Sequence, residues 1–156
     1  MKESLDKAVE ELKRVDHLVF VSLKYTRTAD VLKSILQRMI NAFSFGFEAL
    51  LIYAKEQKLI TDYPENKALR CNTLKEIYPN EKRLHEYINY YLKLRKIMLA
   101  EYTKREEYRR HVTMSVVIDG EPIDITMDSV KEDFGMLREF IKYVKELIFG
   151  KPEEEY

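Results

Sequence analysis

The stretch MINAFSFGFEALLIY, residues 39–53, is apolar on nearly every side of the helix that it predicts. It continues a stripe in which apolar residues recur every three or four positions, the spacing of one helical face. The stripe consists of Leu32, Ile35, Met39, Phe43, Gly46, Phe47, Leu50 and Ala54, and further apolar surface comes from Ile40, Phe45, Leu51 and Ile52. Such a helix is either central to its own bundle or shared with a second subunit. Gly46 lets a neighbouring helix come close, either within the chain or across a dimer.

Two further amphipathic helices are predicted near the ends of the chain. The first runs from about Ser4 to Leu23 and carries a single apolar stripe. For the last helix, Ser129 and Glu132 have the spacing of a capping box, and Gly150 marks the end. Residues 151–156 form a short acidic tail.

The middle of the chain predicts a short helix followed by a long one. Residues 60–83 are irregular, and either Asn72 or Thr73 is a fitting cap for a short helix that reaches Ile77. The long helix is expected from about Asn80 to His111, because apolar and aromatic residues keep helical spacing across that range. Its core face changes from apolar to aromatic and cationic toward the C-terminal end.

A β-hairpin is predicted over residues 113–126, because Asp119 and Gly120 are a strong signal for a two-residue turn. That turn fixes the register of the two strands. The opposed pairs are Ile118 with Glu121, Val116 with Ile123, and Met114 with Ile125. The apolar members fall on one face, and a lone hairpin is marginal in water, so this face must pack on the bundle or on a partner.

These elements predict an all-α protein, an antiparallel bundle of four long helices with a short connecting helix and one inserted β-hairpin. A single domain over residues 1–150 is expected. No stretch is judged to approach the length of a membrane span, and Met1 leads directly into charged residues. We therefore expect a cytoplasmic protein without a membrane partner.

Composition limits the class of protein. The 156 residues contain 27 Lys plus Arg and 27 Asp plus Glu, so the chain is not built around a long-range field for nucleic acid. Cys71 is the only cysteine, which excludes a disulfide scaffold and favours a partly buried loop thiol over a nucleophile. Abundant Lys and Glu, with few Gln, are typical of a thermophilic source.

The segment KREEYRRH, residues 104–111, carries the candidate chemistry. If Arg105 and His111 came together, the imidazole could act as general acid or base, and the guanidinium could hold the phosphate of an RNA. Lys104, Tyr108, Arg109 and Arg110 are candidate RNA contacts. In the alternative interpretation, Arg105 pairs with a buried carboxylate and the other cations form a solvated face near a helix C-terminus. No metal site or cofactor is predicted, since the histidines lie on separate segments.

The order of elements resembles the HEPN domain family. HEPN domains are small helical bundles with an aromatic-rich second helix, like residues 37–55, and an irregular connection, like residues 60–83. Their third helix ends in an Arg-x(4–6)-His motif, which Arg105 and His111 match with five residues between them. Glu106 occupies the position where active members usually carry Asn or another small polar residue. A carboxylate there would repel RNA.

Three functions follow from these observations. The resemblance implies a binding or interaction module, a homodimer that partners a nucleotidyltransferase in a toxin–antitoxin or defence system. The first alternative is a metal-independent endoribonuclease in which two subunits juxtapose Arg105 and His111. The second alternative is a structural helical protein without an active site.

Overall fold

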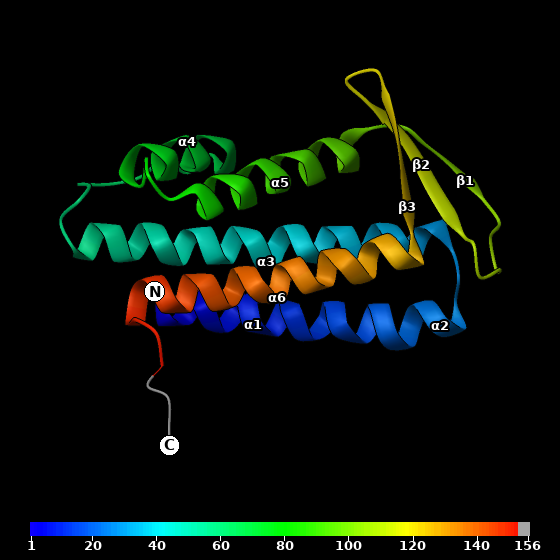
Figure 1. The fold of residues 1–156 in the computed structure, drawn as a ribbon, viewed down its shortest axis with the longest axis horizontal. Coiled ribbons are helices and arrows are strands. Elements are labelled where there is room, and N and C mark those ends of the chain that lie inside the picture. The colour runs from blue at the N-terminus through cyan, green and yellow to red at the C-terminus, as the bar shows by residue number, and fades with distance from the viewer. Residues whose placement is uncertain (153–156) are drawn as a thin grey trace.

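The computed structural model describes residues 1–152, which form five helical segments and one three-stranded antiparallel sheet (Figure 1). The first segment is continuous and comprises α1 (Lys2–His17), a π-helical turn η1 (Leu18–Ser22) and α2 (Leu23–Tyr25). The other helices are α3 (Ala29–Glu56), α4 (Lys67–Ile77), α5 (Lys82–Leu99) and α6 (Met127–Phe149). The strands are β1 (Tyr102–Arg105), β2 (Thr113–Ile118) and β3 (Glu121–Thr126). Of the predicted acidic tail, residues 153–156 lie outside the described residues.

Helix α3 is the centre of the bundle. It packs against α1, α4, α5 and α6, and the predicted apolar stripe on it is buried (Figure 1). Its all-round apolar character is therefore explained by contacts within the chain, the first of the two alternatives. The homodimer stays a prediction, and this surface no longer argues for it.

The same helix is long and apolar enough, by length and composition alone, to cross a membrane. The sequence-based statement that no stretch approaches a membrane span is therefore wrong. Of its most apolar window, 61% is buried inside the chain. Burial of this kind is the pattern of the core helix of a bundle.

Gly46 makes the tight crossing between α3 and α6. A Cβ added to Gly46 would lie 2.5 Å from Cε2 of Phe140, which is fully buried. The Phe140 ring also packs on Phe43, with ring centroids 4.6 Å apart, and on Phe47. The close approach predicted at Gly46 is thus a contact within one chain.

We expect Gly46→Ala to lower the free energy of unfolding by about 1–3 kcal/mol, because the added methyl group must displace the Phe140 ring in a packed core. Gly135 of α6 is the matched control, since an added Cβ would meet nothing within 4 Å. Gly135→Ala should stabilise the helix by up to about 1 kcal/mol. Urea unfolding followed by circular dichroism measures both, and equal effects would contradict this account of the crossing.

The cap of α6 differs from the predicted one. Thr126 is the N-cap, and its hydroxyl accepts the Ser129 backbone N–H at 3.1 Å. The Ser129 hydroxyl in turn accepts the Thr126 N–H at 2.8 Å. The capping box predicted from Ser129 and Glu132 is therefore wrong, because a Thr in the preceding strand already supplies the cap. The predicted end at Gly150 is confirmed, with φ of 82°.

Helix α4 begins earlier than predicted. The Asn66 side chain accepts the Leu69 N–H at 3.0 Å and caps the helix, so Asn72 and Thr73 lie inside it. Cys71 is a buried helical residue and not a loop thiol. Burial raises the pKa of this thiol to about 11, which leaves it protonated and poorly nucleophilic near neutral pH.

The sheet is a three-strand meander and not an isolated hairpin. The predicted register of β2 and β3 is confirmed, with Val116 opposite Ile123 and Met114 opposite Ile125. Met114 and Val116 are buried, so the apolar face packs on the bundle. The additional strand, β1, pairs antiparallel with β2 and gives the order β1-β2-β3.

Candidate functional site

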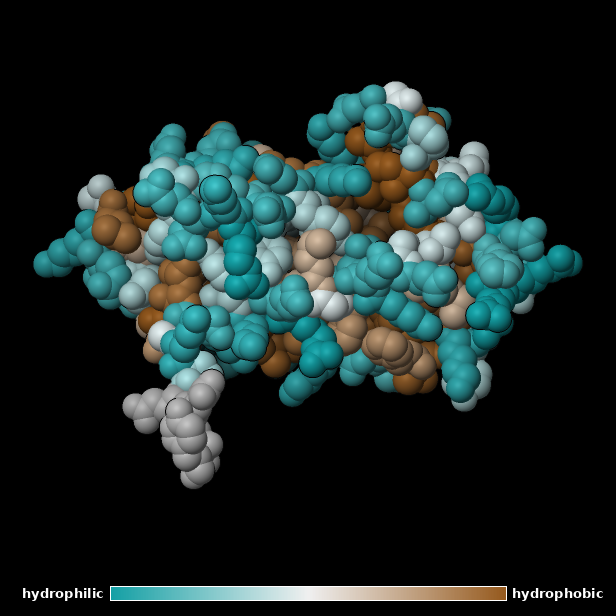
Figure 2. Space-filling view, viewed as in Figure 1, coloured by the Kyte–Doolittle hydropathy of each residue, from teal (hydrophilic) through white to brown (hydrophobic). Residues whose placement is uncertain are grey.

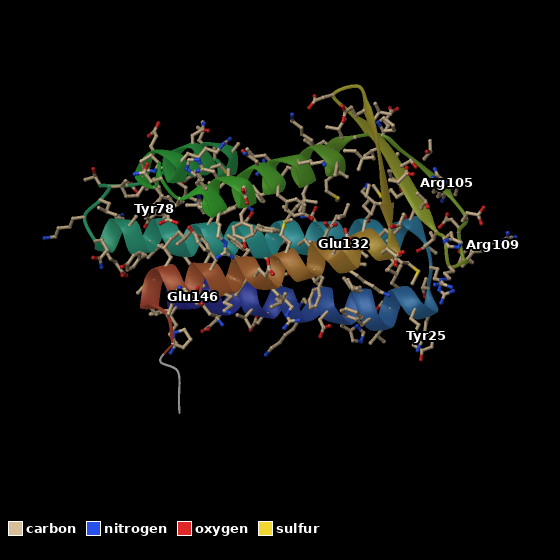
Figure 3. The ribbon with its side chains drawn as sticks, in the orientation of Figure 1. Tyr25, Tyr78, Arg105, Arg109, Glu132 and Glu146 are labelled. Carbon is tan, nitrogen blue, oxygen red and sulfur yellow. The ribbon has the colours of Figure 1, made fainter. Side chains whose placement is uncertain are left out.

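Residues 104–111 do not form the end of a helix. Helix α5 stops at Leu99, Arg105 is the last residue of β1, and His111 belongs to the connection before β2. The long helix predicted from about Asn80 to His111 is therefore wrong beyond Leu99. Figure 3 shows Arg105 and Arg109 at the end of the bundle where Tyr25 also lies.

The β1–β2 connection is hydrogen-bonded to the backbone at the start of α3. The Tyr108 backbone N–H donates to the Arg27 carbonyl at 2.6 Å. The Glu107 carboxylate accepts the Ala29 N–H at 3.0 Å and also binds Lys104 Nζ at 3.0 Å. The hydrogen bond from Lys104, and then that from the Ala29 backbone, lower the pKa of the Glu107 carboxyl. A carboxylate at this position is favoured by the partial positive charge of the helix N-terminus.

We expect Glu107→Gln to destabilise the protein near neutral pH. A carboxyl whose pKa is lowered by folding contributes stability above its unfolded-state pKa, and this stability is lost as the pH falls. The stability difference from the natural chain should therefore shrink as the pH falls below about 4.5, the ordinary pKa of this group. Glu106→Gln is the matched control, and it should have little effect on stability both near neutral pH and in acid. Urea unfolding across this range measures both, and a pH-independent deficit would contradict the prediction.

Arg105 lies in a polar network on the outer face of the sheet, with one residue from each strand. Its Nη2 is 2.9 Å from Asp124 Oδ2, and its Nη1 donates to Ser115 Oγ at 2.9 Å. The Ser115 hydroxyl donates to Asp124 Oδ1 at 2.6 Å. The hydrogen bond from Ser115, and then that from Arg105, lower the pKa of the Asp124 carboxyl. Arg105 is thus paired with a carboxylate, as the alternative interpretation expected, although this carboxylate is exposed.

Glu106 does not neutralise Arg105. Its carboxylate is 3.9 Å from Nη1 of Arg109 instead. Arg105 lines a hollow on the outer sheet face together with Ser115 and Asp124. His111 is exposed and lines a separate small hollow. Within one chain, therefore, the geometry does not place the guanidinium and the imidazole around a common phosphate.

The remaining predicted contacts share this end of the molecule. Lys104, Tyr108, Arg109 and Arg110 are all exposed, and Tyr108 has φ of 64°, a left-handed conformation that is uncommon for a bulky residue. Lys104 is held by Glu107. Contact of these side chains with RNA stays a prediction.

We expect the natural chain to leave RNA intact in EDTA, because the Arg105 guanidinium is held by Asp124. Arg105→Ala and His111→Ala should be indistinguishable from it, and Asp124→Asn tests whether release of the guanidinium gains activity. Denaturing gel electrophoresis of labelled RNAs measures cleavage. Cleavage that both alanine variants abolish, with their folding intact, would instead establish the endoribonuclease alternative.

The groove between α5 and the β2–β3 hairpin was not found from the sequence. It has a volume of about 710 Å³, and apolar surface is visible in the hollow below the hairpin tip (Figure 2). Its lining residues are Asn89, Leu92, Lys93, Arg95, Lys96, Leu99, Ile118, Asp119, Glu121 and Ile123. Leu99 is 88% exposed and adds apolar surface to this groove. The signal in the sequence was that Leu92 and Leu99 share a helix face outside the core stripe.

The two walls of this groove carry opposite charge. Helix α5 contributes Lys93 and Arg95, and the hairpin contributes Glu121. Lys96 of α5 reaches across the groove to Asp119 of the hairpin at 3.3 Å. The ion pairs of residues 1–152 leave Lys93 and Arg95 without a carboxylate partner.

Within residues 1–152, no group of three or more His, Cys, Asp or Glu side chains is arranged to hold a metal ion. Comparison of the chain with protein-family models, curated proteins and solved structures found no match. The HEPN resemblance therefore stays a prediction from the sequence.

Proposed function

We propose that this protein is a non-catalytic interaction module, and that the groove between α5 and the β2–β3 hairpin binds an amphipathic helix of a partner protein. The observation that carries the proposal is an open hollow with apolar side chains, including the 88% exposed Leu99. Burying a leucine side chain contributes about 1.5–3 kcal/mol, so a partner that covers Leu99 would gain affinity from it.

The apolar and charged side chains on the two walls of the groove indicate what kind of partner would bind there. An amphipathic helix would place its apolar face on Leu92, Leu99 and Ile123, in the helix-in-groove mode of recognition. Acidic residues along one flank would face Lys93 and Arg95, and basic residues along the other flank would face Glu121. Complementary charges of this kind set orientation and specificity more than affinity.

This proposal keeps the leading interpretation of the sequence. A nucleotidyltransferase partner, as the HEPN resemblance implies, would have to present a helix of this description. A second copy of the chain is the other occupant that the experiment below must distinguish. The endoribonuclease alternative has less support, because Asp124 binds the Arg105 guanidinium.

We expect helical peptides selected by display against the full chain to carry the apolar face and acidic flank described above. Leu99→Asp and Lys93→Glu should each weaken binding of a selected peptide about tenfold or more, measured by fluorescence anisotropy, because Leu99 supplies apolar surface and Lys93 a positive charge to the groove lining. Phe149→Asp is the matched control, because Phe149 is also an exposed apolar residue, 62% exposed, but lies at the end of α6.

Three results would contradict the proposal. In the first, the selected peptides bind Leu99→Asp as well as the natural chain. In the second, Phe149→Asp abolishes binding and Leu99→Asp does not. In the third, the natural chain is a dimer by sedimentation and Leu99→Asp is a monomer, which would assign the groove to a second copy.

A further inference from the structure

A second concave site lies between α1 and α3, away from the groove. It has a volume of about 480 Å³. Its lining residues are Lys13, Arg14, His17 and Leu18 from the first helical segment, and Ser34 and Arg38 from α3. The lining contains cations, a hydroxyl and an imidazole, and no carboxylate.

A buried carboxylate positions two of these cations. Glu11 is only 5% exposed, and its Oε1 accepts Arg14 Nη1 at 2.8 Å and Arg38 Nη1 at 3.2 Å. Each guanidinium carries five N–H donors in a rigid fork, so the contact with Glu11 leaves donors for a ligand. Glu11 therefore orients two arginines from different helices at the edge of one pocket.

The charges do not balance within the site. Lys13, Arg14 and Arg38 are cations, and the Glu11 carboxylate contacts Arg14 and Arg38, which leaves two positive charges at the site. The ion pairs of residues 1–152 do not include Lys13 or His17. A dianion would neutralise this excess.

The helix changes its geometry at the edge of the pocket. The π-helical turn Leu18–Ser22 begins directly after His17. Turns of this kind are rare and occur frequently at functional sites. The π-turn is a second observation that points to this place, independent of the charges.

We propose that this pocket binds the phosphate group of a small phosphate monoester. A terminal phosphate has two negative charges near neutral pH and several strong acceptor oxygens, which match the forked donors of Arg14 and Arg38, the Lys13 ammonium and the Ser34 hydroxyl. A nucleic-acid strand fits less well, because it needs an extended track of cations. The exposed Asp6, Glu10 and Asp16 of α1 would repel a polyanion instead. The site is independent of the groove.

The experiment is a titration of the full-length, isotopically labelled chain, followed by amide NMR, with phenyl phosphate, inorganic phosphate and phenol as separate probes. We expect saturable shifts at Leu18 and Ser34 with phenyl phosphate and none with phenol. If inorganic phosphate produces the same shifts at a similar concentration, the phosphate alone is recognised. If inorganic phosphate binds more weakly than phenyl phosphate, the ester group contributes to binding. Both results support the proposal.

The variants avoid the arginines, because removing either would leave Glu11 buried with less compensation. Lys13→Gln removes a charge and His17→Gln removes an imidazole, both outside the Glu11 pairs, and each should weaken phenyl phosphate binding about three- to tenfold. Lys145→Gln, an exposed lysine of α6, is the matched control and should bind as the natural chain does. The proposal is overturned if no saturable shift occurs at millimolar phenyl phosphate, or if both pocket variants bind unchanged. A short RNA that produces the same shifts at much lower concentration would also overturn it.

Discussion

The aromatic packing of α3 against α6 is the constraint on which the rest of the structure depends. Phe140 sits over Gly46 and contacts Phe43 and Phe47, so the axes of these two helices can approach closely only where a side chain is missing. Interiors are packed as densely as organic crystals and transmit small displacements. The positions of α1 and α5, and hence of both candidate sites, are set by how they pack around this central pair.

The parts of the fold that could be predicted are those specified by local chemistry. Asp119 and Gly120 determine a two-residue turn, and such a turn leaves one register for β2 and β3, which the structure confirms. The spacing of apolar residues likewise predicts the buried face of α6. Gly150, which has a positive φ, predicts where that helix ends. Each of these features depends on residues close together in the chain.

The parts that could not be predicted depend on distant residues. Tyr102 and Arg105 continue the spacing of α5, and only pairing with β2 makes this segment a strand. The partner of Arg105 is Asp124, which is 19 positions away, and no pattern within residues 104–111 predicts this pair. The two walls of the groove, α5 and the β2–β3 hairpin, were each predicted from the sequence as separate elements. Their proximity follows from where the sheet lies against α5. Residues 104–111 were therefore predicted in the wrong geometry, as the end of a helix, and they lie in a strand and the connection that follows it.

The position of β1 at the margin of the sheet has a consequence for self-association. A marginal strand offers its free backbone groups to any other extended chain, and long apolar ones promote aggregation. Here that strand has only four residues, and two of them are Lys104 and Arg105. Two copies that tried to join their sheets through β1 would bring like charges together. The short length of β1 and its two cations, which first suggested contact with RNA, thus also disfavour pairing between the sheets of neighbouring molecules.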